Sequence, residues 1–302
     1  MQIFNALLLT IWVGITIFTS HILGQQAYDW LPTAAAAEAE LVGHLFSFLV
    51  TLGTIVFLGV GGMIAYSILF YRTAASDRSD APPIRGNSTL EIVWTVIPIL
   101  LVIWIASYSY DIYQRMDTLG SLPLAHLHLL ESPAYAEMGS QDSQPSDTQP
   151  SEQIEVLAKQ WAWSFHYPSQ NITSTELHLP VNQSVHLVLQ SEDVLHGFFV
   201  PNFRIKQDII PNQAIAFQFT PNRVGQYPLY DSQFSGTYFA LMQATVYVDT
   251  PKQYAQWLAQ AATQPPVPAV NSANSEHAQP PSLPVRSHWH TVSPAPPPLV
   301  NQ

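Results

Sequence analysis

Cysteine is absent from this chain, and charged residues are scarce. None of the 302 residues is cysteine. That absence excludes disulfide bonds, thiolate metal sites and cysteine nucleophiles. Charged residues make up 10% of the chain, against about 25% in an average soluble domain. Because hydrophobic residues reach 47%, the composition indicates membrane-spanning segments.

Basic residues are the scarcer of the two charged classes. The chain has 10 Lys and Arg against 21 Asp and Glu, which gives a formal net charge of -11. This balance argues against nucleic acid as a partner, because binding a phosphate backbone requires a basic surface. It permits docking of a basic partner protein, and an acidic solvated surface is the simpler interpretation.

Three long runs carry no charged residue: Ile3 to Leu23, Leu45 to Tyr71 and Ile92 to Tyr110. Each reaches or approaches the roughly 20 residues that a helix needs to cross a membrane. We expect a transmembrane helix within residues 1–25 and a transmembrane helix hairpin within 40–116. Residues 1–25 are alternatively a cleaved signal peptide. Because "MQIF" has no basic n-region and the run exceeds about 15 residues, a retained helix is favoured.

Three arginines indicate the orientation. Arg72, Arg78 and Arg85 lie between the second and third runs, whereas no Lys or Arg separates the first run from the second. Short loops rich in basic residues stay in the cytoplasm. We therefore expect a cytoplasmic N-terminus, with everything after about Tyr113 outside, in a periplasm or lumen.

The stretch "STLEIVW" opens the third run. Ser88 and Glu91 have the S-x-x-E spacing of a capping box, which predicts a helix start at this point. The carboxylate of Glu91 also interacts favourably with the helix dipole there.

Two segments are rich in Pro, Ser and Gln and show no periodicity. Residues 117–152, with "GSQDSQPSDTQPSEQ", are expected to form a flexible linker or insertion. Residues 261–302, with "TQPPVPAV" and "SPAPPPLV", are expected to form a disordered tail. His277, His288 and His290 lie in this tail, where solvated side chains are favoured over metal ligands.

Residues 153–260 carry an alternating pattern. "SVHLVLQ" places Val185, Leu187 and Leu189 on one face, and "AIAFQF" and "ATVYV" repeat the alternation. Turn signals such as "PVNQ", "IPNQ" and "TPNRVGQ" separate these runs. The pattern predicts an all-β sandwich or barrel, closed by an amphipathic helix at "PKQYAQWLAQAA".

Four stretches together carry a family resemblance: "GNSTLEIVWTVIP", "QWAWSFHYP", "SEDVLHGFFVPNFRIKQDIIPNQ" and "GQYPLYDSQFSGTYFALMQATVYV". In this order the chain resembles subunit II of heme–copper respiratory oxidases, over most of residues 40–260 apart from the linker. The resemblance implies a membrane-anchored all-β fold, in which a two-helix hairpin precedes a cupredoxin-like β-barrel outside the membrane. In that family the barrel holds a binuclear copper centre, which takes electrons from cytochrome c.

The copper ligands of the family follow a pattern: a His after "DVL", then C-x-E-x-C-G-x-x-H-x-x-M. The two thiolates bridge the coppers, and imidazole and thioether groups complete a soft coordination shell. In chain order these positions fall on His196, Asp231, Gln233, Ser235, Gly236, Phe239 and Met242. Both thiolates and one imidazole are therefore missing. Gln233 also lacks the carboxylate that the family uses at a nearby magnesium.

The resemblance also sets expectations for single residues. His196 is expected to be a hydrogen-bonded structural residue and Met242 a core residue, with a mononuclear metal site of His196, Asp231 and Met242 as the alternative. Trp161 matches the aromatic residue that accepts electrons from cytochrome c, and without copper we expect it to serve packing. Glu91 matches the glutamate at the mouth of a proton-uptake channel.

The resemblance implies a subunit II without its binuclear copper, as in quinol oxidases and in the alternative respiratory terminal oxidases of cyanobacteria. We expect no cofactor in this chain, and hemes and one copper in a partner subunit I, with subunit III beside it. The complex would reduce oxygen to water and translocate protons in a bacterial plasma or thylakoid membrane, with membrane quinol favoured over cytochrome c as donor. The alternatives are a cytochrome c oxidase subunit with an atypical copper site and a non-enzymatic, membrane-anchored assembly protein.

Overall fold

The structure, a computed structural model, describes residues 2–72, 86–116, 152–278 and 292–301. The predicted linker, except for its last residue, lies outside these ranges, as do Arg78, Arg85, His288 and His290. The chain divides into two compact units, one of residues 1–32 and 41–116 and one of residues 33–40 and 117–302. Each unit is described by itself below.

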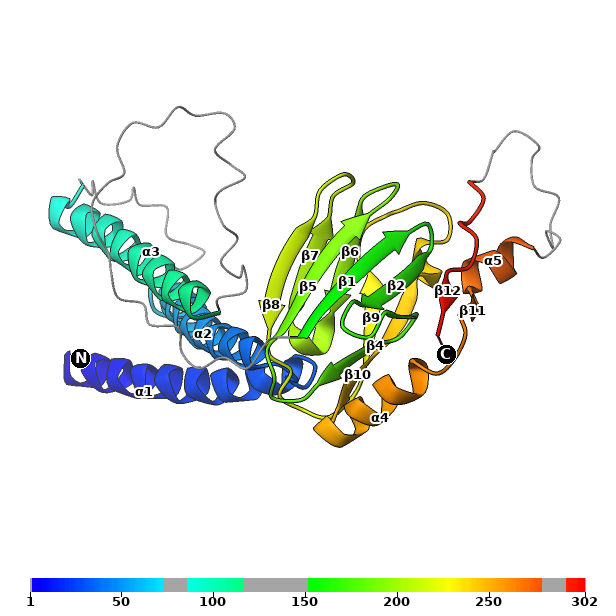
Figure 1. Cartoon of the computed structure of the whole chain (residues 1–302). Coiled ribbons are helices and arrows are strands. Elements are labelled where there is room, and N and C mark those ends of the chain that lie inside the picture. Colours follow the sequence, from blue (N-terminus) through cyan, green and yellow to red (C-terminus); the bar gives the residue numbers. More distant parts are fainter. Residues whose placement is uncertain (1, 73–85, 117–151, 279–291, 302) are drawn as a thin grey trace, which may run out of the picture. The chain divides into compact units, whose positions relative to one another are not determined.

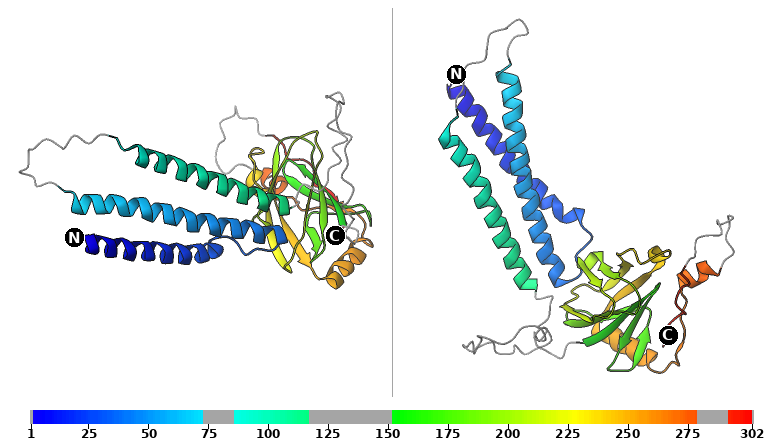
Figure 2. Two further views of the ribbon diagram at one scale, coloured as in Figure 1. Left: turned by 90° about the vertical axis from the view of Figure 1, so that its left-hand side faces the viewer. Right: turned by 90° about the horizontal axis from the view of Figure 1, so that it is seen from above.

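Long helices make up most of the first unit: α1 (Gln2–Gln26), α2 (Ala37–Phe70), of which residues 37–40 belong to the second unit, and α3 (Ser88–Met116). Each is long and apolar enough to cross a membrane, as the composition predicts. Many of their large apolar side chains are exposed, such as Phe57, Met63 and Ile103. Such surfaces suit a lipid environment. Figures 1 and 2 show the three helices, with α1 and α2 in blue and α3 in blue-green.

Contacts between the helices involve both polar and aromatic groups. Ser47 Oγ of α2 donates to the carbonyl oxygen of Gly24 in α1 at 2.6 Å. Between α2 and α3, the rings of Phe48 and Trp104 meet edge-on at 5.1 Å. Small residues such as Ser47 and Gly24 allow helix backbones to approach closely in a membrane.

Two five-stranded sheets form the second unit, with strand orders β3-β2-β1-β5-β8 and β4-β10-β9-β6-β7 (Figure 1). The strands are β1 (Glu152–Lys159), β2 (Ala162–Tyr167), β3 (Ile172–Ser174), β4 (Leu177–Pro180), β5 (Val185–Ser191), β6 (His196–Val200), β7 (Ile205–Ile209), β8 (Ile215–Phe219), β9 (Gly225–Asp231) and β10 (Gln243–Asp249). Short 3₁₀ helices, η3 (Pro201–Phe203) and η4 (Phe239–Leu241), interrupt the second sheet. The predicted all-β domain is confirmed.

The core lies between the two sheets. Val185, Leu187 and Leu189 of β5 are all buried, as their alternation predicts. Phe198 of the second sheet meets Phe217 of the first edge-on, with ring centroids 5.8 Å apart. Side chains from two inner faces interdigitate in this way in a β-sandwich.

Residues 33–40, which precede and begin α2, are part of this β unit. Ala36 forms a β-bridge with Pro221, and Ala35 N donates to Asn202 O at 3.0 Å. Ala35, Ala36 and Ala39 are fully buried. Small side chains fit here because the backbone of "PTAAAAEAE" runs directly against the sheet.

Helix α4 (Pro251–Ala261) closes the domain, as predicted. Thr250 and Gln253 form a capping box at its start, which satisfies backbone donors of the first turn. Trp257 stacks on His178 of β4 with ring centroids 4.0 Å apart. The apolar face of the helix therefore covers the sheet.

The expectation of a disordered tail over 261–302 needs correction for the residues that the structure describes. Ala261 ends α4, and the chain continues through β11 (Val267–Pro268), α5 (Ser272–His277) and β12 (Leu299–Val300). Strands β11 and β12 pair antiparallel. Proline-rich sequence favours extended backbone, and here backbone hydrogen bonds to the β domain hold that extended chain in place.

Candidate functional site

The positions that match the copper ligands gather at the ends of neighbouring strands. His196 begins β6 and Asp231 ends β9, and these strands pair antiparallel with Phe198 opposite Asp231. Residues 232–242 then form the loop that leads through η4 to β10. The sheet register therefore places His196 and Asp231 together at one end of the barrel.

Both ring nitrogens of His196 contact carboxylates. Nδ1 lies 2.8 Å from Oδ2 of Asp231, and Nε2 lies 2.9 Å from Oδ1 of Asp193. The imidazole is fully buried. A neutral imidazole has one N–H donor, whereas an ionised carboxylate can only accept. The geometry therefore favours the imidazolium form, which donates from both nitrogens.

Both carboxylate oxygens of Asp231 are fully engaged as well. Oδ1 accepts from the backbone N–H groups of Gly197 and Gln233, at 2.8 and 3.0 Å. Oδ2 accepts from His196 and from Ser235 Oγ, the latter at 2.7 Å. Such a carboxylate offsets the cost of its own burial through charge-assisted hydrogen bonds.

The protonation of these groups follows from their contacts. Burial alone lowers the pKa of His196, but the hydrogen bonds and charges of Asp231 and Asp193 outweigh it and raise the pKa above 6.5. Burial raises the pKa of Asp231, but hydrogen bonds from His196, Gln233, Ser235 and Gly197 lower it below 3.8 overall. The cluster of Asp193, His196, Asp231 and Ser235, the acid–histidine cluster below, is thus favoured in its ionised form.

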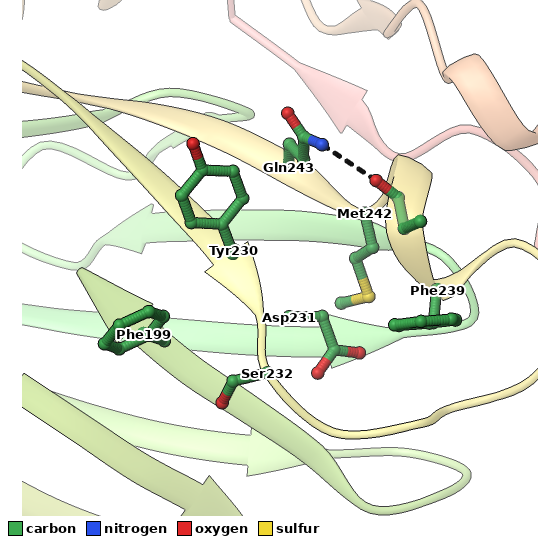
Figure 3. Close-up of a pocket in the computed structure, with 8 residues that line it drawn as sticks. Phe199, Tyr230, Asp231, Ser232, Phe239, Met242 and Gln243 are labelled. Atoms are coloured by element: carbon green, nitrogen blue, oxygen red, sulfur yellow. Dashed lines mark hydrogen bonds between the residues drawn. The ribbon is translucent and has the colours of Figure 1, made fainter. Parts of the chain in front are cut away.

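Other positions of the loop lie beside this cluster. Asp231, Phe239 and Met242 line a surface pocket of about 410 Å³ together with Phe199 and Tyr230 (Figure 3). The side chain of Met242 is buried, as expected of a core residue.

The side chain of Gln233 binds a residue outside the acid–histidine cluster. Its Nε2 donates to Oδ1 of Asp208 in β7 at 2.8 Å. The amide thus ties the loop to the edge strand of its sheet. A glutamate at position 233 would face this carboxylate with a like charge, which is unfavourable at such a distance.

This donor set does not fit the binuclear copper centre. The bridging thiolates are absent, and the imidazole and carboxylate at the site are bound to each other. Within the described residues, no group of three or more His, Asp or Glu side chains is arranged to hold a metal ion. A thiolate-bridged pair needs soft ligands that oxygen donors do not replace.

Trp161 is buried, with 2% of its surface exposed. Its indole Nε1 donates to the carbonyl oxygen of Ser235 at 3.2 Å, and its ring meets Tyr238 edge-on at 5.1 Å. The side chain therefore packs against the loop of residues 232–242.

Glu91 lies in the first turns of α3 and is exposed. The predicted Ser88–Glu91 capping box is not the arrangement found. Asn87 caps the helix instead, because its Oδ1 accepts from the N–H groups of Thr89 and Leu90 at 3.1 and 3.2 Å. Asn is as good an N-cap as Ser. Among the described residues, Asn87 therefore fills the capping role that the sequence assigned to Ser88 and Glu91.

Sequence reasoning missed Asp193, the second carboxylate on His196. Its Oδ2 also accepts from the backbone N–H of Gln160 at 2.7 Å. The available signal was the spacing in "SEDVLH", which places Asp193 three residues before His196 on a turn. A turn of this kind brings a carboxylate and an imidazole together, but the sequence does not reveal its geometry.

Comparison with known families identifies the chain. The family model described as cytochrome c oxidase subunit II, transmembrane domain, matches residues 22–112, and that of the periplasmic domain matches residues 170–248. The chain is 32% identical to "Cytochrome c oxidase subunit 2" of Synechocystis sp. over 277 residues, covering 85% of this chain and 83% of that protein. The present chain is therefore a membrane-anchored subunit with a cupredoxin-like domain. The chain belongs to the subunit II family of heme–copper oxidases.

Other relatives carry different names. "Cytochrome c oxidase subunit 2" of Thermostichus vulcanus is 33% identical, covering 89% of this chain and 86% of that protein. "Quinol oxidase subunit 2" of Bacillus subtilis is 26% identical, covering 65% and 54%. The solved periplasmic domain of subunit II of cytochrome oxidase from Bradyrhizobium japonicum is 26% identical, with a TM-score of 0.35, covering 36% of this chain and 91% of that one. The family thus includes relatives named for each donor.

Proposed function

We propose that this chain is a subunit II without a binuclear copper centre, in a terminal oxidase that takes its electrons from membrane quinol. The acid–histidine cluster supports the proposal most directly. His196 and Asp231 bind each other at 2.8 Å, and hydrogen bonds within the protein satisfy the polar atoms of both side chains. A relative named quinol oxidase subunit 2 offers a precedent within the family.

The whole complex would reduce oxygen to water and translocate protons. The catalytic subunit I would carry the hemes and one copper, with subunit III beside it. This chain would anchor its β domain outside a bacterial plasma or thylakoid membrane, with the N-terminus in the cytoplasm. Glu91 would stand at the cytoplasmic mouth of a proton-uptake path, where an exposed carboxylate exchanges protons readily with water.

The test uses the complex purified from native membranes. Oxygen uptake driven by reduced quinol, with hemes present and no binuclear copper signal in electron paramagnetic resonance, is the expected result. Oxygen uptake driven by reduced cytochrome c alone would refute the quinol proposal.

The names of the Synechocystis and Thermostichus relatives favour a second candidate, a cytochrome c oxidase subunit with an atypical copper site. It requires copper that copurifies with this chain in stoichiometric amounts. A third outcome, purification of the chain without any heme, would instead indicate an assembly protein.

A further inference from the structure

The C-terminal segment, defined as the described residues 264–278 and 292–301, is bound to the edge of the first sheet. Asn301 N donates to Thr173 O of β3 at 2.8 Å, and Thr173 N donates to Oδ1 of Asn301 at 3.0 Å. Strand β3 is the last strand of its sheet on that side. Edge strands offer free backbone groups to other chains, and here the protein's own C-terminal segment takes them.

A second set of contacts reaches Trp161 and its neighbour. Ala295 N donates to Gln160 O at 2.6 Å. Asn271 Nδ2 lies 3.5 Å from Trp161 O, while its Oδ1 caps α5 by accepting from Asn274 N. Both arms of the C-terminal segment, before and after residues 279–291, therefore bind the turn of Gln160 and Trp161 that joins β1 to β2.

Burial shows that these contacts form a packed interface. Ala273 of α5 is fully buried, and Val300 of β12 is 1% exposed. A cavity of about 60 Å³ remains between the β domain and the C-terminal segment. Trp161 and Ala162 of the domain and Asn271 and Pro298 of the segment line it. Figure 1 shows α5, β11 and β12 together in orange to red at the end of the chain.

The loop of residues 232–242 also contacts the C-terminal segment, through Tyr238. Tyr238 meets Trp161 edge-on at 5.1 Å and His277 of α5 edge-on at 6.1 Å. Tyr238 Oη lies 3.4 Å from Nδ1 of His277. The C-terminal segment thus lies beside the aromatic pair of Trp161 and Tyr238.

We propose that the C-terminal segment is a built-in cover, which closes the Trp161 face of the β domain to other proteins. Its functional meaning rests on the proposed function, because an oxidase supplied by membrane quinol needs no docking site for a soluble electron-carrier protein on this face. The cover occupies both the backbone edge of β3 and the surface over Trp161. A partner would have to displace it to reach either.

Because the chain has no cysteine of its own, a single engineered cysteine is its only thiol and reports on one position. Ala162→Cys places a thiol in the small cavity under the cover, and Gln170→Cys places one at an exposed turn. Both variants are treated, in the intact complex, with a polyethylene-glycol maleimide, which reports access for a macromolecule. We expect Ala162→Cys to react at least about tenfold more slowly, because reaction requires local opening.

Displacing the cover should remove this difference. Ala273→Glu puts a charge at a buried contact of α5, whereas Ala278→Glu makes the same change at an exposed position of the same segment. With the Ala162→Cys reporter, Ala273→Glu and a truncation after Thr263 should each raise the labelling rate about tenfold. Ala278→Glu should leave it unchanged.

Hydrogen exchange of β5 amides verifies in each variant that the barrel remains folded. If Ala273→Glu unfolds the barrel, the truncation decides. Equal labelling of the two reporters in the otherwise unchanged chain, or no acceleration on truncation, would overturn the cover. These readouts do not depend on the electron donor, so a failure of the quinol proposal and a failure of the cover are distinguishable.

Discussion

Two regions of this chain match positions that the family uses for chemistry, and they satisfy their polar groups in opposite ways. At the end of the barrel, His196 and Asp231 are buried and use every hydrogen-bonding atom within the chain. At the start of α3, Glu91 is exposed, and the described residues offer its carboxylate no hydrogen-bond donor. In the first, the closed region, hydrogen bonds within the chain satisfy the polar side chains. In the second, the open region, the carboxylate is available to water or a partner subunit.

The difference has a physical cause. A buried polar group must find partners within the fold, because leaving it unpaired costs several kcal/mol. At positions 231 and 235, where the family pattern has cysteine, Asp231 and Ser235 therefore find hydrogen-bond partners within the fold. An exposed carboxylate such as Glu91 faces no such demand, and its properties depend on what assembles around it.

The largest expected change reverses the closed region. The combined variant Asp231→Cys, Gln233→Glu, Ser235→Cys and Phe239→His restores the family pattern around His196 and Met242. We expect it to bind about two copper ions per chain, because bridging thiolates and a second imidazole supply the soft ligands. Absorption and paramagnetic resonance of the copper-loaded complex measure this. A variant that keeps Phe239 is the control, and absence of copper from the full variant would contradict the assigned positions.

Removing one charge from the closed region should destabilise it strongly. Asp231→Ala leaves His196 without one carboxylate and should cost about 3–5 kcal/mol, the usual cost of breaking a buried ion pair. Hydrogen exchange of β6 and β9 amides in the assembled complex measures the loss. Asp208→Ala is the control, since Asp208 accepts one hydrogen bond from Gln233 and should cost about 1 kcal/mol. Equal losses in both variants would argue against the ion pair.

The open region should respond in turnover and leave stability unchanged. Glu91→Gln keeps the size of the side chain and removes its proton exchange. We expect quinol-driven oxygen uptake and proton pumping to fall about tenfold or more. Unchanged turnover and pumping would remove Glu91 from the proton path.

The closed region should also make stability depend on pH. The raised pKa of His196 contributes stability that is full below pH 6.5 and is lost as the pH rises through that raised pKa. The lowered pKa values of Asp231 and Asp193 contribute stability that is present above pH 3.8 and is lost as the pH falls through them. The cause in both cases is linkage, because a group whose pKa differs between the folded and unfolded chain binds or releases protons on unfolding.

Unfolding of the β domain, followed by hydrogen exchange across this pH range, measures the dependence. Stability should be greatest between pH 3.8 and 6.5 as far as these groups are concerned. His196→Gln should remove the loss on the alkaline side. If that loss persists in the variant, it arises from other groups.

The smallest effect separates helix capping from proton uptake. Asn87→Ala should cost about 1 kcal/mol at the start of α3, the usual value for an N-cap. Exchange of the Thr89 and Leu90 amides should quicken while oxygen uptake stays unchanged. A fall in turnover as large as that of Glu91→Gln would show that the helix start itself is needed.

Local patterns predicted most of the fold. The uncharged runs predicted α1, α2 and α3, and the alternation around Leu187 predicted β5, because both periodicities reflect which face is buried. The structured C-terminal segment was not predictable, since its prolines and polar residues lack periodicity and its order depends on contacts with β3 and Trp161. Asp193 was missed for the same reason, because its role depends on the geometry of a turn.

The sequence by itself determined what this protein lacks. Without cysteine, no arrangement of the chain produces a thiolate-bridged copper pair. Only the tertiary structure decided what stands in its place. Neighbouring strands bring His196 and Asp231 together across 35 residues of sequence, and a turn adds Asp193. Such partnerships depend on sheet register, which one sequence does not display.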